Sequence, residues 1–139
     1  MSGGFVADSS VGVSWVVLSQ STEVTDHLLD DVAAGRPFMV PVLWMFEVAN
    51  SLVVLTRRKR IDPGECSRGR SILGRLMPAV DDEGSRLALG AITDLAQKHE
   101  LSVYDAAYLE LAIRKRLPLA SRDASLNKAA KHAGVKTLV

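Results

Sequence analysis

Short apolar runs that lead into helical patterns recur along this chain, and they constrain its fold more than any other feature. They occupy residues 5–7, 38–40, 79–80 and 118–120, and a last apolar stretch covers residues 135–139. Segments with helical spacing separate them, and strands joined by such long crossovers pair in parallel. The alternation predicts an α/β fold, a three-layer α/β/α sandwich with a central parallel sheet, formed by residues 1–139 as a single domain.

The segments between the runs carry helix start and stop signals. We expect helices over residues 11–18, 23–34, 42–58 and 84–99, a helix that begins at Asp105, and a final helix capped by Asp123. Asp62 and Pro63 open a further helix as N-cap and first helical residue. The 42–58 segment is apolar nearly all the way round, which predicts that this helix is well buried.

Composition narrows the class of protein. With 47% hydrophobic and 24% charged residues, the chain is of the ordinary globular type. No apolar run reaches the roughly 18 residues that span a bilayer, and the N-terminus lacks signal-peptide features, so we expect no membrane association and a cytoplasmic location. The single cysteine, Cys66, excludes an internal disulfide and a cysteine cluster for zinc.

Four acids have positions that suggest a shared site. Asp8 and Asp123 follow predicted strands, at the sheet edge where functional groups of parallel sheets gather, and Asp105 opens a helix. Each of these three, taken alone, is explained as an N-cap. Glu47 is not, because it lies inside an apolar helix, where a polar side chain needs a partner. Asn50 shares its helical face.

A cluster of carboxylates has an electrostatic consequence. Two carboxylates roughly 4 Å apart repel by about 4 kcal/mol at an effective dielectric near 20, so a cluster raises pKa values or binds a cation. His27, His99 and His132 lack the spacing of zinc ligands. Oxygen ligands suit Mg²⁺ or Mn²⁺, and such ions clamp and polarise a phosphodiester. The acids therefore indicate a metal-dependent nuclease.

Four motifs occur in order along the chain. They are Val6-Ala-Asp8-Ser9, the Pro41…Glu47-x-x-Asn50 segment, Leu101-x-x-x-Asp105-Ala106, and Ser121-Arg122-Asp123. Through these motifs the chain, from Phe5 to about Val135, resembles a PIN-domain ribonuclease of the kind that forms the VapC toxin of VapBC toxin–antitoxin pairs. The family usually has Thr-x-Asp as the fourth motif, and Ser121 keeps the hydroxyl group.

The resemblance implies both a fold and a function. Its strand order is near 3-2-1-4-5, and its acidic quartet, here Asp8, Glu47, Asp105 and Asp123, surrounds one or two Mg²⁺ ions, with Mn²⁺ as a possible substitute. It implies a Mg²⁺-dependent endoribonuclease, the toxin of a type II pair, in which metal-activated water leaves a 5′-phosphate and a 3′-hydroxyl. Its expected partners are RNA, a small cognate antitoxin and a second copy of the chain, with the apolar surfaces of helices 23–34 and 42–58 as candidate contacts.

Supporting roles are expected for further polar residues. Ser9 and Ser121 are candidates to hold water or carboxylates in place, and Asn50 to orient Glu47, although all three also suit cap and turn roles. Two basic runs stand at predicted helix ends, where the helix dipole alone favours cations. The candidate phosphate contacts are Arg57, Arg58, Arg60, Arg114, Arg116 and Arg122.

Three other functions are compatible with parts of the sequence. A non-catalytic PIN-like module that binds RNA or protein is the main alternative, and the complete quartet argues against it. A phosphoacceptor receiver domain leaves Glu47, Asp105 and Asp123 unexplained. A haloacid-dehalogenase-type phosphatase requires a second aspartate where Ser10 stands.

Overall fold

Four short parallel strands form the central sheet in the computed structural model, which describes residues 3–139. They are β1 (Phe5–Ala7), β2 (Phe38–Pro41), β3 (Ala79–Asp81) and β4 (Leu119–Ala120), in the order β3-β2-β1-β4. Val6 of β1 pairs with Met39 on one side and with Leu119 on the other. The predicted α/β fold with a parallel sheet is confirmed.

The last apolar stretch forms less structure than we expected. Residues 135–139 make one parallel bridge, between Thr137 and Leu119, where a full edge strand was predicted. The Leu119 N–H donates to the Lys136 carbonyl, and the Leu138 N–H donates to the Leu119 carbonyl. This segment therefore lies beside β4, in the position that a fifth strand would have in the order 3-2-1-4-5.

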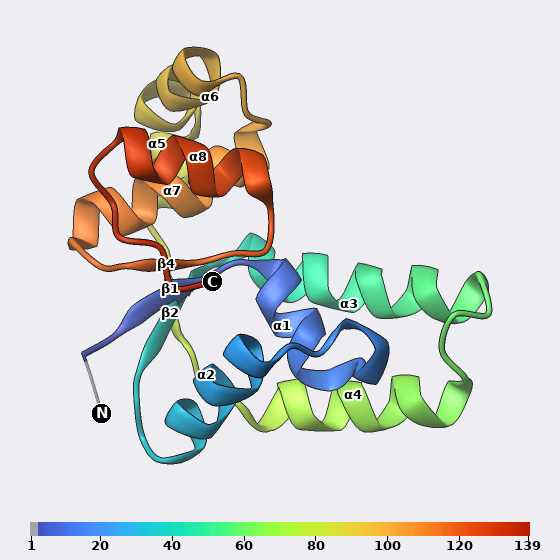
Figure 1. Cartoon of the computed structure of the whole chain (residues 1–139). Coiled ribbons are helices and arrows are strands. Elements are labelled where there is room, and N and C mark those ends of the chain that lie inside the picture. The colour runs from blue at the N-terminus through green and yellow to red at the C-terminus, as the bar shows by residue number, and fades with distance from the viewer. Residues whose placement is uncertain (1–2) are drawn as a thin grey trace.

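Helices cover both faces of the sheet (Figure 1). On one side lie α1 (Ser9–Val16), the short η1 (Leu18–Gln20), α2 (Glu23–Ala33), α3 (Leu43–Arg57) and α4 (Pro63–Arg75). On the other side lie α5 (Gly84–Leu87), η2 (Ala88–Ile92), α6 (Thr93–His99), α7 (Val103–Lys115) and α8 (Ala124–His132). The α3 and α4 helices pack against each other and form an arm that projects beyond the sheet (Figure 1).

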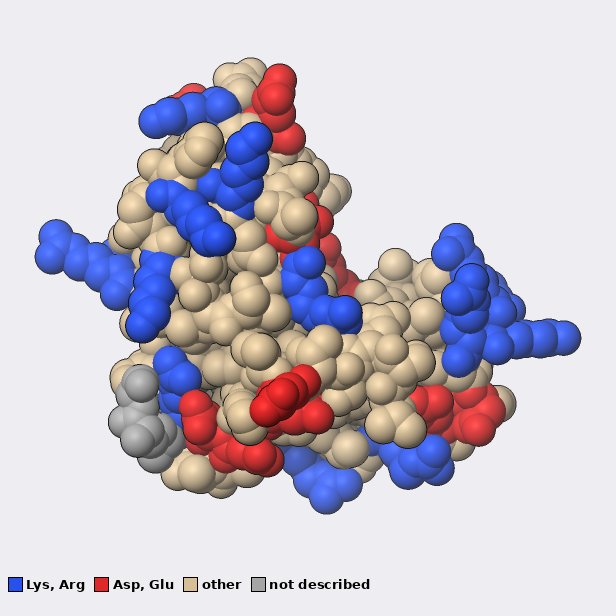
Figure 2. Space-filling model, viewed as in Figure 1, with Lys and Arg blue, Asp and Glu red and all other residues tan. Residues whose placement is uncertain are grey.

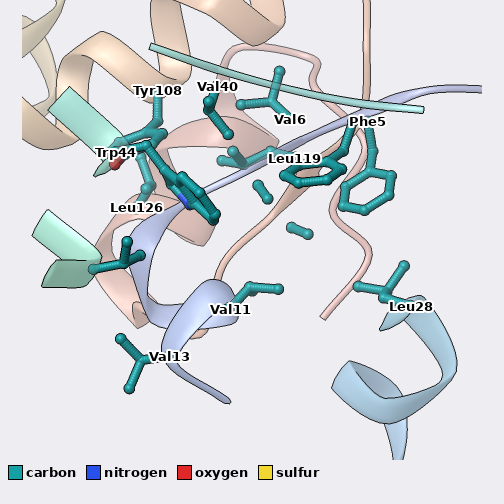
Figure 3. Packing of buried hydrophobic residues seen from close by; sticks show 14 of the residues in the cluster. Phe5, Val6, Val11, Val13, Leu28, Val40, Trp44, Tyr108, Leu119 and Leu126 are labelled. Atoms are coloured by element: carbon teal, nitrogen blue, oxygen red, sulfur yellow. The ribbon is translucent and has the colours of Figure 1, made fainter. Parts of the chain in front are cut away.

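The core is centred on β1. Phe5, Val6 and Ala7 are all fully buried, as expected for a strand that has neighbours on both sides and helices on both faces. Figure 3 shows Phe5 beside Val6 and Leu119, and Trp44 lying across the same cluster. The Trp44 indole N–H donates to the Asp8 carbonyl at 3.1 Å, so the start of α3 is tied to the end of β1.

Two predictions about helices are wrong. The segment 84–99 is not one helix, because Gly90 has non-helical backbone angles (φ −114°, ψ −107°) within a π-helical turn that separates α5 from α6. The apolar spacing continues through this break, so periodicity alone did not show it. The second wrong prediction is that α3 is well buried, because the exposed fraction of Phe46 on this helix is 73%. The projecting arm buries only one face of α3, that of Trp44, Val48 and Leu52.

Within residues 3–139, no helix combines the length and the apolar character needed to cross a membrane.

Candidate functional site

Asp8 follows the carboxyl end of β1, and hydrogen bonds hold both of its carboxylate oxygens. It is buried and caps α1, with Oδ1 accepting bonds from the Val11 N–H at 3.2 Å and the Ser10 hydroxyl at 2.5 Å. Oδ2 accepts a bond from the Ser121 hydroxyl. Burial raises the pKa of Asp8, while these donors and the Val11 N–H act in the opposite direction. The N-cap role does not prevent a second role for the same carboxylate.

Glu47 lies just after the first turn of α3 and is oriented by Tyr108. The hydroxyl of Tyr108, a residue only 1% exposed, donates to Glu47 Oε1 at 2.5 Å. Burial raises the pKa of Glu47, and the negative charges of Asp105 and Asp8 raise it further. The sequence analysis did not predict this role for Tyr108, although the sequence contains a signal for it. A tyrosine on an apolar helix, one turn after Asp105, must find a partner for its hydroxyl when it is buried.

Asp105 lies in the first turn of α7 and does not begin the helix. Ser102 is the N-cap, and its hydroxyl accepts a bond from the Asp105 N–H at 3.0 Å. The Asp105 carboxylate is therefore not used for capping. Burial raises its pKa, and so does the negative charge of Asp123.

Asp123 caps α8, with Oδ1 accepting a bond from the Leu126 N–H at 2.8 Å, and its side chain is exposed. Ser121 joins it to the rest of the site. The Ser121 hydroxyl donates to Asp8 and accepts a bond from the Asp123 N–H at 2.9 Å. One hydroxyl thus fixes the positions of two acids that are far apart in the sequence.

The four acids lie near one another at the carboxyl edge of the sheet. Burial is the main cause of the raised pKa values of Asp8, Glu47 and Asp105, and a neighbouring acid contributes to each. Asp105 acts on Asp8 and on Glu47, Asp8 also acts on Glu47, and Asp123 acts on Asp105. Figure 2 shows acidic side chains along the notch between the α3–α4 arm and the layer of α5 to α8. The site therefore carries excess negative charge that a cation would relieve.

The donor set can be tested against a divalent metal. Among residues 3–139, no three carboxylate, imidazole or thiol side chains lie close enough together to enclose a metal ion. Mg²⁺, however, keeps several of its waters and is commonly held by only one or two carboxylates. Oxygen donors and uncompensated negative charge suit such a hydrated cation. The residues fit Mg²⁺ by their chemistry, although they do not form a closed cage.

Two of the expected supporting residues have other positions. Ser10, not Ser9, donates to Asp8, and the Ser10 hydroxyl also accepts a bond from the Arg122 N–H. In the described part of the chain no hydrogen bond joins Asn50 to Glu47, and the Asn50 side chain is exposed. Asn50 lies one turn beyond Glu47 on α3 and lines a neighbouring pocket.

Arg114 is not available for the phosphate contact that we predicted. Its guanidinium uses all five N–H donors on three carboxylates, those of Asp81, Glu83 and Glu110, at 2.8 to 3.1 Å. Asp81 and Glu110 are buried. Arg114 thus joins α7 to the end of β3 and has a structural role.

The other candidate arginines lie at different distances from the acids. Arg57, Arg58 and Arg60 are exposed at the tip of the α3–α4 arm, where Figure 2 shows a basic cluster. The helical rise places Arg57 about 15 Å along α3 from Glu47. Arg116 is exposed at the far end of α7. Arg122 is beside the acids, and its Nη1 donates to the Ser14 hydroxyl and to the Gln20 carbonyl.

Comparisons with known proteins identify the fold. No family model matches the sequence, and no curated protein matches it. Among solved structures, PAE2754 from Pyrobaculum aerophilum is similar with a TM-score of 0.71 and 20% identity, covering 98% of this chain and 84% of that one. VapBC2 from Rickettsia felis, bound to a DNA fragment from its promoter, has a TM-score of 0.65 and 12% identity, covering 96% of each chain. A toxin–antitoxin complex from Klebsiella pneumoniae has a TM-score of 0.56 and 19% identity, covering 86% of each. The chain therefore shares a PIN-like α/β/α fold with these structures.

Proposed function

We propose that the protein is a Mg²⁺-dependent endoribonuclease that acts as the toxin of a toxin–antitoxin pair. The observation that carries the proposal is the gathering of four carboxylates, from four separate segments, near the carboxyl edge of the sheet, where burial and neighbouring acids raise the pKa values of Asp8, Glu47 and Asp105. Helix capping accounts for Asp8 and Asp123 but not for Glu47 or Asp105, and perturbed acids of this kind cluster at functional sites. The order of the four motifs supports the same reading.

The residues have distinct tasks in this proposal. Asp8, Glu47, Asp105 and Asp123 would hold the cation, which when bound would neutralise phosphodiester charge and lower the pKa of a water molecule. The hydroxyls that surround Asp8 fix its carboxylate, and the Tyr108 hydroxyl fixes Glu47. Such outer contacts keep ligand oxygens oriented before the substrate arrives.

The toxin role and its partner protein are supported by the structural neighbours, which include VapBC2 and a toxin–antitoxin complex. The exposed apolar side of α3, with Met45, Phe46 and Val53, is a surface that a protein partner would cover. An antitoxin segment or a second copy of the chain would bury it. Co-expression with the product of a neighbouring small reading frame, followed by co-purification, tests for the antitoxin.

RNA cleavage tests the nuclease directly. We expect the protein to cut total RNA with Mg²⁺ and not with EDTA, and the Asp8→Asn and Asp105→Asn variants to lose the activity. Asp30→Asn is the matched control, because Asp30 is an exposed residue of α2. Unchanged cleavage in the two site variants, with retained folding by circular dichroism, would refute the assignment.

One observation favours a second candidate, a non-catalytic PIN-like module that binds RNA or protein. Within residues 3–139 no three potential ligands enclose a metal. Calorimetric titration with Mn²⁺ separates the two functions. Metal binding that is lost in Asp8→Asn supports the nuclease, and a protein that binds RNA without binding metal supports the module.

A further inference from the structure

A pocket of neutral polar side chains lies beside the acidic site, between α1 and α3. Its volume is about 370 Å³, within the roughly 300–1,000 Å³ of small-molecule sites. Its polar lining includes Ser9, Gln20, Asn50 and Ser51, and its apolar lining includes Val13 and Val54.

The pocket and the acidic site share structural elements. Asn50 follows Glu47 by one helical turn on α3, and Ser10, which also lines the pocket, donates to Asp8. At the other side, Arg122 donates to the carbonyl of Gln20. A polymer that leaves the acids along α3 would therefore pass over this pocket.

The lining selects a particular chemistry. Within residues 3–139 the lining of the pocket contains no charged side chain, so the lining itself offers hydrogen-bonding and apolar groups and no ion-pair partner. Asn50 and Gln20 each present an amide with donor and acceptor groups, and in the described residues neither side-chain amide is used in a hydrogen bond. Such amides pair with the edges of nucleobases, while the apolar wall suits the flat face of a base. Unpaired RNA bases are recognised by such edge contacts.

The order of residues along α3 adds a direction. Glu47 is followed by Asn50, then by Val54, and then by Arg58 at the basic tip, all at helical spacing. From the rise of a helix, Asn50 lies about 4.5 Å and Arg58 about 16 Å beyond Glu47 along the axis. A single RNA strand along α3 would meet the acids, then the pocket, then the basic cluster that Figure 2 shows at the end of the arm.

We propose that this pocket binds an unpaired nucleobase next to the cleaved phosphodiester, and that Asn50 and Gln20 determine which base is preferred. This inference rests on the proposed nuclease function in one respect, namely that RNA occupies the acidic site. The pocket is otherwise a binding site that can be measured without catalysis.

A binding experiment tests the pocket by itself. The full chain, labelled with ¹⁵N and kept in EDTA, is titrated with adenosine, guanosine, cytidine and uridine. We expect saturable shifts of the Asn50 and Gln20 side-chain amide signals, larger for one base than for the others. The amide of Gln97, an exposed residue of α6, is the internal control and should not move. If none of the four nucleosides shifts the two amides, the proposal is overturned.

Cleavage mapping tests the role in specificity. Sequencing of the RNA ends produced by the wild type should show a preferred base at a position adjacent to the cut. In Asn50→Ala and Gln20→Ala this preference should fall by roughly 5- to 100-fold, the range expected for a good contact to a base edge, whereas Gln97→Ala should keep it. Cleavage by all variants with the wild-type base preference overturns the proposal. If the protein cuts no RNA, the nuclease proposal fails, and the nucleoside titration still decides whether the pocket binds a base.

Discussion

The contact between Tyr108 and Glu47 allows a sharp test of how the site is held together. In Tyr108→Phe the ring still fills its buried position, but Glu47 Oε1 loses a donor at 2.5 Å. A hydrogen bond to a charged group contributes about 1.5–3 kcal/mol. Because Glu47 is only partly buried, water replaces part of this bond, so we expect a loss of about 1–2 kcal/mol in the free energy of unfolding at neutral pH.

The effect of pH on this loss has a definite sign. The hydrogen bond lowers the pKa of Glu47, although burial keeps that pKa above its ordinary 4.5. Removing the bond raises the pKa further, so the variant regains stability relative to the wild type as pH falls from neutrality through the pKa of the folded state. The deficit of Tyr108→Phe should therefore be largest at neutral pH and shrink toward pH 4.5.

Urea unfolding followed by tryptophan fluorescence measures the stability of the variant. Calorimetric titration with Mn²⁺ measures its metal affinity. We expect this affinity to fall about 10- to 100-fold in Tyr108→Phe, because the variant loses a contact that orients a metal ligand. Tyr104→Phe is the matched control, because Tyr104 is on the same helix and is 64% exposed. Surface changes of this kind stay within about 0.5 kcal/mol. If the two variants behave alike in both measurements, the Tyr108 hydroxyl does not organise Glu47.

Three further predictions concern the surrounding structure. Gly12→Ala would place a methyl group 2.7 Å from the buried indole ring of Trp44 and should lower the free energy of unfolding in urea by about 1–3 kcal/mol. Gly74 is an exposed helical residue with no neighbour within 4 Å, so Gly74→Ala should raise the free energy of unfolding by about 0.5–1 kcal/mol. Arg114→Leu leaves buried carboxylates unpaired and should cost about 3 kcal/mol at neutral pH. Arg114 holds the pKa of Asp81 below its ordinary 3.8. The stability that this pair contributes should therefore be present above pH 3.8 and be lost as the pH falls through the pKa of Asp81 in the folded protein. Acid unfolding of the wild type measures this loss. Asp8→Asn should not reduce the melting temperature in EDTA at neutral pH, since the pKa of Asp8 is raised, but it should abolish the stabilisation by Mg²⁺. It should also reduce the gain in stability of the metal-free wild type as pH falls toward 3.8, and the part due to Glu47 and Asp105 should remain.

The acids of the candidate site were identifiable without coordinates because they break local rules. Glu47 is a charged residue within an apolar helix, and capping does not explain it. Asp8 and Asp123 follow strands, and parallel strands direct their carboxyl ends to one edge. Ser121 was predictable from its position beside Asp123. The contacts of Glu47 with Tyr108 and of Arg114 with Asp81 were not, because a hydrogen bond between residues 61 or 33 positions apart leaves no pattern in a single sequence.

What the sequence by itself determined was the α/β alternation, the parallel sheet and the positions of the four acids, because hydrophobic period and helix caps act over a few residues. The tertiary structure alone decided that one side of α3 is exposed on a projecting arm, and that Gly90 interrupts a helix whose apolar spacing is continuous. It also decided that Arg114 donates all of its N–H groups to three carboxylates. It also decided that Asn50 lines a pocket instead of supporting Glu47. The physical reason is the same in each case. Burial, side-chain pairing and free surface depend on which segments meet in space, and a local pattern specifies the segment but not its neighbours.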